Sequence, residues 1–244
     1  DDDAQVIFET LNARGEPLTP SDLVRNFIFL TAARQDLDVS QLYSKQWSQF
    51  EEDPPHQPFW KQEERQGRLK RSRMDLFLFH YVTFKTGEEL KIGHLYQVFK
   101  DWWELSQDRE IGGELDELLR YSQFYRQLLE PDISTPFGRF SQHMRALDTT
   151  TAYPLVLWIA GEIGSETPEF IAMLDDIESF LIRRAVCGYN QKAYNRLFLE
   201  FLNRLKEDGV PPSRGALSAL LASSNAPSAI WPPDDAFRRS LVGD

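Results

Sequence analysis

Cysteine is almost absent from this chain of 244 residues, since Cys187 is the only one. An internal disulfide is therefore impossible, and we expect a cytoplasmic protein, because reducing compartments keep thiols free. The chain also lacks an apolar run of about 20 residues, the length that spans a bilayer, so we expect no membrane partner. An initiator methionine is lacking too, because the chain begins Asp1-Asp2-Asp3. We therefore expect an internal fragment of a larger protein.

Motifs that carry catalytic chemistry are missing as well. The chain has no Gly-rich phosphate loop, no dinucleotide fingerprint and no nucleophile elbow. Its histidines form no HExxH motif and are scattered at His56, His80, His94 and His143, so we expect no metal site. We interpret His80 as a core or boundary residue, and Cys187 as an inert buried thiol rather than a nucleophile. Composition and spacing alone thus identify no reaction.

Basic residues are too few to balance the acids, and the net charge is −11. Such a chain repels a phosphate backbone overall, so nucleic-acid contact would require a local basic patch. One segment qualifies, although Glu63 and Glu64 interrupt it. Its cations are Lys61, Arg65, Arg68, Lys70, Arg71 and Arg73. Two interpretations stay open: a DNA-binding module, or the ordinary solvated surface that charge runs usually form.

Helical periodicity, by contrast, is present almost throughout. The clearest helix start is Thr19-Pro20-Ser21-Asp22, in which a capping threonine, a proline at the first helical position and an acid three residues after the cap agree. This helix should run to about Arg34. Its expected apolar face consists of Leu23, Phe27 and Leu30.

The remaining pattern predicts a mainly α protein, a multi-helix orthogonal bundle with little or no β-sheet. The apolar run 74–84 indicates a buried helix, although its β-branched and aromatic residues leave a strand open. Residues 53–58 should form a loop because they contain three prolines. Other helices are expected over 39–50, 95–105, 114–129, 136–147, 153–163, 168–186 and 193–205, and a short one from Ser213.

Three segments resemble one known family, in that family's order. Residues 7–29, IFETLNARGEPLTPSDLVRNFIF, resemble the FxxxN region of the ParB/sulfiredoxin-like nucleotidase domain of GmrSD-type phage-restriction proteins. Residues 177–188, IESFLIRRAVCG, are similar to that family's IESYLVRR…G helix, and 195–201 also follow its pattern. Residues 231–241, which begin Trp-Pro, are similar to the segment that leads into its HNH-type nuclease domain.

The resemblance implies a parent that is a nucleoside-triphosphate-dependent DNA endonuclease, with NTP and Mg as cofactors and modified or phage DNA as partner. The family's DGQQR-type motif is missing, and no His-bearing nuclease motif follows Trp231. We therefore expect this chain alone to be inactive, with self-association left open. The implied domains are 1–35, the C-terminal part of the nucleotidase module; 36–222, a helical domain; and 223–244, a linker to a missing nuclease domain.

The implied nucleotide-binding residues are Phe8, Asn12, Arg14 and Gly15. The amide of Asn12 can donate and accept hydrogen bonds at once, but Asn12 could equally end a short helix before Gly15. Phe8 would line the pocket wall or belong to a core. Arg14 would meet a phosphate with its planar fork or lie in solvent, and the nearby Arg25 is expected to face water.

Arg183 and Arg184 are further candidates for DNA contact. Neighbouring residues on a helix diverge by about 100°, so both cannot face one groove. One of them is expected to pair with an acid such as Glu178 or Asp176. The alternative to a restriction module is a non-catalytic interaction scaffold, suggested by the acidic charge and the tryptophans at 102 and 103.

Overall fold

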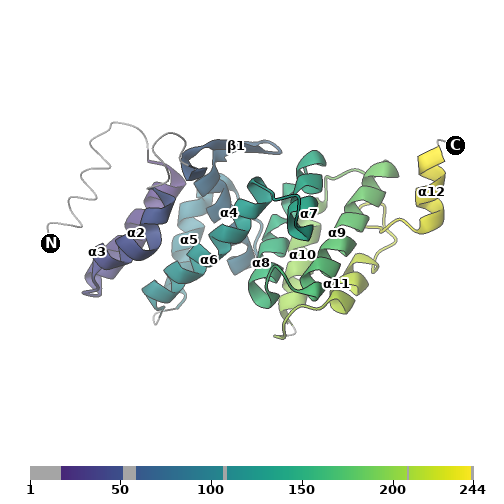
Figure 1. Ribbon diagram of the computed structural model, residues 1–244. Coiled ribbons are helices and arrows are strands. Elements are labelled where there is room, and N and C mark those ends of the chain that lie inside the picture. The colour runs from purple at the N-terminus through teal and green to yellow at the C-terminus, as the bar shows by residue number, and fades with distance from the viewer. Residues whose placement is uncertain (1–17, 52–58, 107–108, 208, 243–244) are drawn as a thin grey trace. The chain divides into compact units, whose positions relative to one another are not determined.

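The computed structural model of the chain describes residues 18–51, 59–106, 109–207 and 209–242 (Figure 1). Their contacts define two compact units, each described by itself below. Unit 1 comprises 1–86 and 90–122, and unit 2 comprises 87–89 and 123–244. The division falls inside helix α6 (Ile111–Leu129), whereas the sequence suggested boundaries near 35 and 222.

Unit 1 is built around helix α4 (Arg73–Thr86), which contacts α2, α5 and a small hairpin (Figure 1). Nearly every side chain of α4 is buried, as is typical of a helix that is apolar on all sides. The predicted buried helix over 74–84 is thus confirmed, and the strand alternative is wrong. The other elements of unit 1, besides the start of α6, are α2 (Pro20–Arg34), α3 (Val39–Leu42), the π-helix η1 (Tyr43–Trp47), the 3-10 helices η2 (Ser48–Phe50), η3 (Phe59–Lys61) and η4 (Ile92–His94), the strands β1 (Glu63–Gln66) and β2 (Leu69–Ser72), and α5 (Leu95–Glu104).

Helix α2 begins where the sequence predicts, with a complete capping box between Thr19 and Asp22. Its buried face differs by one position from the expected one. Val24 and Ile28 are buried, whereas Leu30 is 39% exposed. Phe27 is half-buried and makes edge-to-face contacts with aromatic rings of α5. The helix therefore presents its apolar side to two neighbours, α4 and α5, rather than to one.

The segment 63–72 holds the antiparallel β1–β2 hairpin, which the sequence analysis missed. Glu64 pairs with Arg71, Arg65 with Lys70 and Gln66 with Leu69 across the two strands. Gly67 occupies the turn with a φ of +57°, a conformation that glycine adopts at little cost.

Unit 2 is arranged around helix α9 (Pro168–Val186), which contacts α7, α8, α11 and α12. Thr167 caps its start and Gly188, with a φ of +73°, follows its end, so the helix has the predicted range 168–186. The other elements are the end of α6, α7 (Pro136–Ala146), the 3-10 helix η5 (Thr150–Ala152), α8 (Tyr153–Ile163), α10 (Tyr194–Glu207), α11 (Arg214–Leu221) and α12 (Asp234–Val242). A mainly α helical bundle, with one two-stranded sheet in the described part of the chain, is thus confirmed.

Candidate functional site

The proposed nucleotide-binding residues belong to the first 17 residues and lie outside the described part of the chain. They are Phe8, Asn12, Arg14 and Gly15. What the structure does describe is the helix that follows them. The backbone N–H of Ser21, in the first turn of α2, donates a 2.9 Å hydrogen bond to the buried carboxylate of Asp75 on α4. This bond satisfies one of the free donors of a helix start and fixes the beginning of α2 to the core of unit 1.

Arg25 and Asn26 on α2 both lie away from solvent. The side chain of Arg25 is only 12% exposed, and its Nε lies 3.1 Å from the carboxylate of Glu51. Its guanidinium also lies over the ring of Tyr43. The expectation that Arg25 faces water is therefore wrong, because Tyr43 of η1 and Glu51, directly after η2, cover its side chain.

The β1–β2 hairpin is attached to unit 1 through its inner face. On this face Gln66 is buried, and its side-chain oxygen lies 2.7 Å from Nε2 of His80 on α4. Glu64, also on this face, accepts a 3.3 Å hydrogen bond from Nε of Arg73. The strands are short and polar, so these contacts with α4, more than strand propensity, hold the hairpin in place.

Arg73 does not belong to the basic patch predicted for this segment. It is the first residue of α4 and is buried, with its guanidinium over the ring of Phe59 at 4.4 Å. Together with its ion pair to Glu64, this position keeps Arg73 from reaching a phosphate on the surface. Its inclusion among DNA-contacting residues is wrong, because the hairpin folds back over it.

The other predicted cations of this segment are all exposed. Arg65 and Lys70 are cross-strand partners on the outer face, and Arg68 lies in the turn. On the same face Glu63 pairs with Lys70 at 2.7 Å. The exposed cations are Lys61, Arg65, Arg68, Lys70 and Arg71.

Arg184 is fully buried in unit 2, and the prediction that it contacts DNA is wrong. No acid in the described residues forms an ion pair with it. Its guanidinium donates to the hydroxyl of Tyr194 at 3.1 Å and to four backbone carbonyls. These carbonyls belong to Ile230 at 2.8 Å, Pro227 and Ser228 at 3.2 Å, and Asn190 at 3.3 Å. The rings of Phe180, Tyr189 and Tyr194 surround the charge. Arg184 thus fixes the segment 227–230 against α9.

Arg183, the next residue back, binds the beginning of α12. Its Nη1 lies 2.7 Å from the carboxylate of Asp234 and donates to the carbonyl of Pro232 at 3.1 Å. The guanidinium also lies over the ring of Phe237. One of the two arginines therefore pairs with an acid, but with Asp234 rather than the expected Glu178 or Asp176. No local pattern points to this partner, because it lies 51 positions further along the chain.

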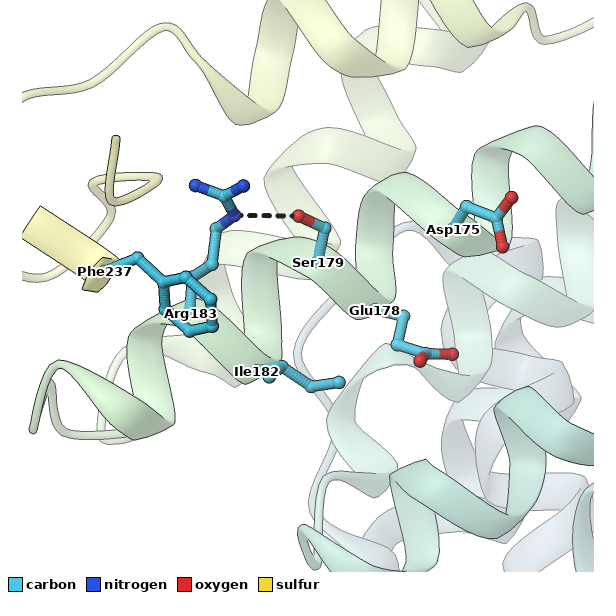
Figure 2. Close-up of a pocket in the computed structure, with 6 residues that line it drawn as sticks. All are labelled: Asp175, Glu178, Ser179, Ile182, Arg183 and Phe237. Atoms are coloured by element: carbon cyan, nitrogen blue, oxygen red, sulfur yellow. Dashed lines mark hydrogen bonds between the residues drawn. The ribbon is translucent and has the colours of Figure 1, made fainter. Parts of the chain in front are cut away.

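A shallow cleft of about 250 Å³ lies between α9 and α12, and Figure 2 draws the residues that line it. Its apolar lining comes from Ile182 and Phe237, and its carboxylates are those of Asp175 and Glu178. Oε1 of Glu178 lies 2.9 Å from Nδ1 of His143, within hydrogen-bond distance. Ser179 accepts a 3.1 Å hydrogen bond from Nε of Arg183, drawn as a dashed line. Because Glu178, Ser179 and Arg183 already have partners in the chain and Asp175 is exposed, we assign no ligand to this cleft.

The two acids expected to pair with one of these arginines, Glu178 and Asp176, make other contacts instead. Asp176 on α9 receives a bidentate pair of 2.9 Å hydrogen bonds from Arg214 of α11 and one from Ser218. Desolvation raises the pKa of Asp176, but these hydrogen bonds outweigh it and the net pKa lies below the ordinary value. This ion pair, which the sequence analysis missed, joins α9 to α11.

Burial also decides the interpretations of His80, Cys187 and the two tryptophans. His80 is a core residue, as predicted, and burial lowers its pKa to about 3. Cys187 is half-buried at the end of α9 rather than buried. Trp103 is buried, and Trp102 is half-buried between Lys85 and Arg109. The tryptophans therefore do not provide the exposed aromatic surface that suggested an interaction scaffold.

No family model, curated protein or solved structure matches this chain. Within the described residues, no three His, Cys, Asp or Glu side chains are grouped so that they could hold a metal ion. No described helix is long and apolar enough to cross a membrane.

Proposed function

We propose that the chain is the helical core and partial nucleotidase module of a GmrSD-like, nucleotide-dependent restriction protein that defends a cell against phage DNA. In this proposal the protein is cytoplasmic, and the NTP, Mg and nuclease chemistry belong to the complete parent. The residues that would meet the nucleotide, Phe8 and Asn12 first among them, lie outside the described residues. We therefore derive no step of hydrolysis.

One geometric observation supports the proposal most strongly. Two of the three family-like segments, 177–188 and 231–241, contact each other in unit 2. Arg183 binds Asp234 and the carbonyl of Pro232, and the rings of Phe180 and Trp231 meet edge to face at 6.5 Å. Because these two segments resemble the same family and also contact each other, we expect them to share a role.

That role is to hold α12 in a fixed place on the helical core. In the family, the segment that resembles 231–241 leads into the nuclease domain. Arg184 fixes 227–230 and Arg183 fixes the start of α12, so this connection is anchored rather than free. We propose that the anchor sets the position of the nuclease domain, so that nucleotide hydrolysis and DNA cleavage remain coupled.

The coding sequence that flanks this chain tests the proposal directly. We expect a DGQQR-like motif upstream and a His-bearing nuclease motif downstream. If neither is present, the proposal is wrong. A second test uses the parent protein with Arg184→Met: NTP hydrolysis should persist while DNA cleavage falls, and an unchanged ratio of the two rates would remove the anchoring role.

The interaction-scaffold alternative has less support, because the tryptophans that suggested it are buried or half-buried. Light scattering of the purified chain tests what remains of it, since a scaffold that acts by self-association should give a mass above 28.4 kDa.

A further inference from the structure

The exposed side chains of the β1–β2 hairpin, together with Lys61 just before it, concentrate positive charge in a chain whose net charge is −11. Between 61 and 72, five cations are exposed, and Glu63 is the one exposed carboxylate among these described residues. Glu64 is half-buried and Arg73 is buried, and the two neutralise each other. The surface charge of the hairpin is therefore opposite in sign to that of the whole chain.

The hairpin also has the shape of an element that binds nucleic acid. Each strand has four residues, which corresponds to roughly 13 Å at about 3.3 Å per residue. Duplex DNA carries one negative charge per about 1.7 Å of axis, so several phosphates lie within the length of this ribbon. A two-stranded ribbon also fits the major groove. Arg65 and Lys70 lie side by side on the outer face, about 5 Å apart at Cβ.

The inner face holds this charged ribbon in a defined position. Gln66 binds His80, Glu64 binds Arg73, and Arg73 lies on the ring of Phe59. A ribbon that is fixed before binding loses less conformational entropy when it meets a partner. The anchor thus presents the outer face without using any of its cations.

We propose that the outer face and turn of this hairpin bind the phosphate backbone of double-stranded DNA through Arg65, Arg68 and Lys70, with Lys61 and Arg71 beside them. The choice of DNA among possible polyanions rests on the proposed function. The charge and position of the hairpin, by contrast, are independent of that proposal. The outer face carries no aromatic side chain between 61 and 72 on which unpaired bases could stack. This composition favours a duplex over single strands and predicts binding with little dependence on base sequence.

Glu63 gives the proposal a second, less obvious consequence. Its carboxylate pairs with Lys70 at 2.7 Å and would lie near the DNA phosphates. Replacing it by glutamine frees Lys70 and removes a repulsive charge. The variant Glu63→Gln should therefore bind DNA more tightly than the wild type, by several-fold at about 0.1 M salt.

The experiment measures fluorescence anisotropy of a labelled 20-base-pair duplex with the full chain, from 50 to 200 mM salt. Each phosphate contact contributes about 0.9 to the slope of log affinity against log salt. The triple variant Arg65→Gln, Arg68→Gln, Lys70→Gln should reduce that slope by about 2.7 and weaken binding by more than tenfold at 50 mM salt. A matched control, Lys192→Gln, Arg196→Gln, Arg204→Gln, removes the same charge from exposed positions of unit 2 and should bind like the wild type.

Four results would overturn the inference: no anisotropy change at 50 mM salt, an equal loss in the control, weaker binding by Glu63→Gln, or equal or tighter binding of RNA or single-stranded DNA. Circular dichroism should show the same melting for all variants, because the changed side chains are exposed. Failure here is distinguishable from failure of the proposed function. If the hairpin binds DNA but the coding sequence lacks the flanking motifs, only the restriction role is wrong. If the motifs are present but the hairpin does not bind DNA, only the proposed hairpin contact is wrong.

Discussion

Replacing Arg184 by methionine should loosen the segment 227–230, whose carbonyls it binds, from the rest of unit 2. Arg184 is 0% exposed and makes five hydrogen bonds, four of them to backbone carbonyls. Methionine fills much of the same volume but donates none of these bonds. The variant therefore separates the polar role of Arg184 from its packing.

The free-energy cost of this substitution follows from the hydrogen bonds that the carbonyls lose. Each buried acceptor that is left without its donor costs about 1–3 kcal/mol. Residues 225–228 are exposed, so the carbonyls of Pro227 and Ser228 can recover hydrogen bonds from water. We therefore expect a total cost of about 3 kcal/mol, which corresponds to a roughly 100-fold rise in the opening equilibrium. Arg184→Lys keeps the charge but not the planar fork of the guanidinium, and should lower the free energy that holds this segment by about 2 kcal/mol.

Hydrogen exchange monitored by mass spectrometry is the assay. The amides of Ala229 and Ile230 both donate to the carbonyl of Ala226, and their exchange should accelerate by about 100-fold in Arg184→Met. The control is Arg196→Met, which removes an exposed arginine of the same unit. An acceleration of less than threefold in Arg184→Met, or an equal effect in the control, would refute the anchoring role.

Three further predictions concern stability. Burial lowers the folded pKa of His80 to about 3, whereas the unfolded chain takes up this proton near pH 6.5. The free energy of unfolding should therefore fall by roughly 2 kcal/mol between pH 6.5 and 4.5. Denaturant melts of His80→Gln should show a weaker dependence on pH over this range, and an equal dependence would contradict the prediction. Asp176→Asn weakens the pair with Arg214 and should lower the free energy of unfolding by about 2 kcal/mol at pH 7. Because the folded pKa of Asp176 lies below its ordinary value of 3.8, the difference between variant and wild type should shrink as the pH falls below 3.8. A difference that does not depend on pH would argue against this ion pair. Gly138→Ala places a Cβ against the carbonyl of Asp132 and should cost about 2 kcal/mol, whereas an unchanged melting temperature would show that α7 can shift.

Local sequence signals determined where most helices begin and end. Thr19, Thr167 and Ser213 each cap a helix at the predicted residue, because the capping bond joins a side chain to a backbone N–H only three residues away. The mainly α class follows from the same signals. Such bonds need no partner from elsewhere in the chain, so sequence is sufficient to place them.

Long-range contacts explain the interpretations that failed. The hairpin at 63–72 has short polar strands, and its inner face is held by His80 and Arg73 of α4. Leu30 is exposed because α2 packs between two helices rather than on one. In each case the residues that determine the structure of the segment lie elsewhere in the sequence.

For the candidate sites, sequence by itself determined which residues carry charge and which segments resemble one family. Only the tertiary structure decided how those charges are used. Arg183 and Arg184 are neighbours in sequence, yet one pairs with Asp234 and the other is buried among carbonyls. Arg65 and Arg73 belong to one basic run, yet one is exposed and the other lies under the hairpin. The physical reason is that the cost of burying a guanidinium depends on acceptors supplied by distant segments, and a local pattern does not contain them.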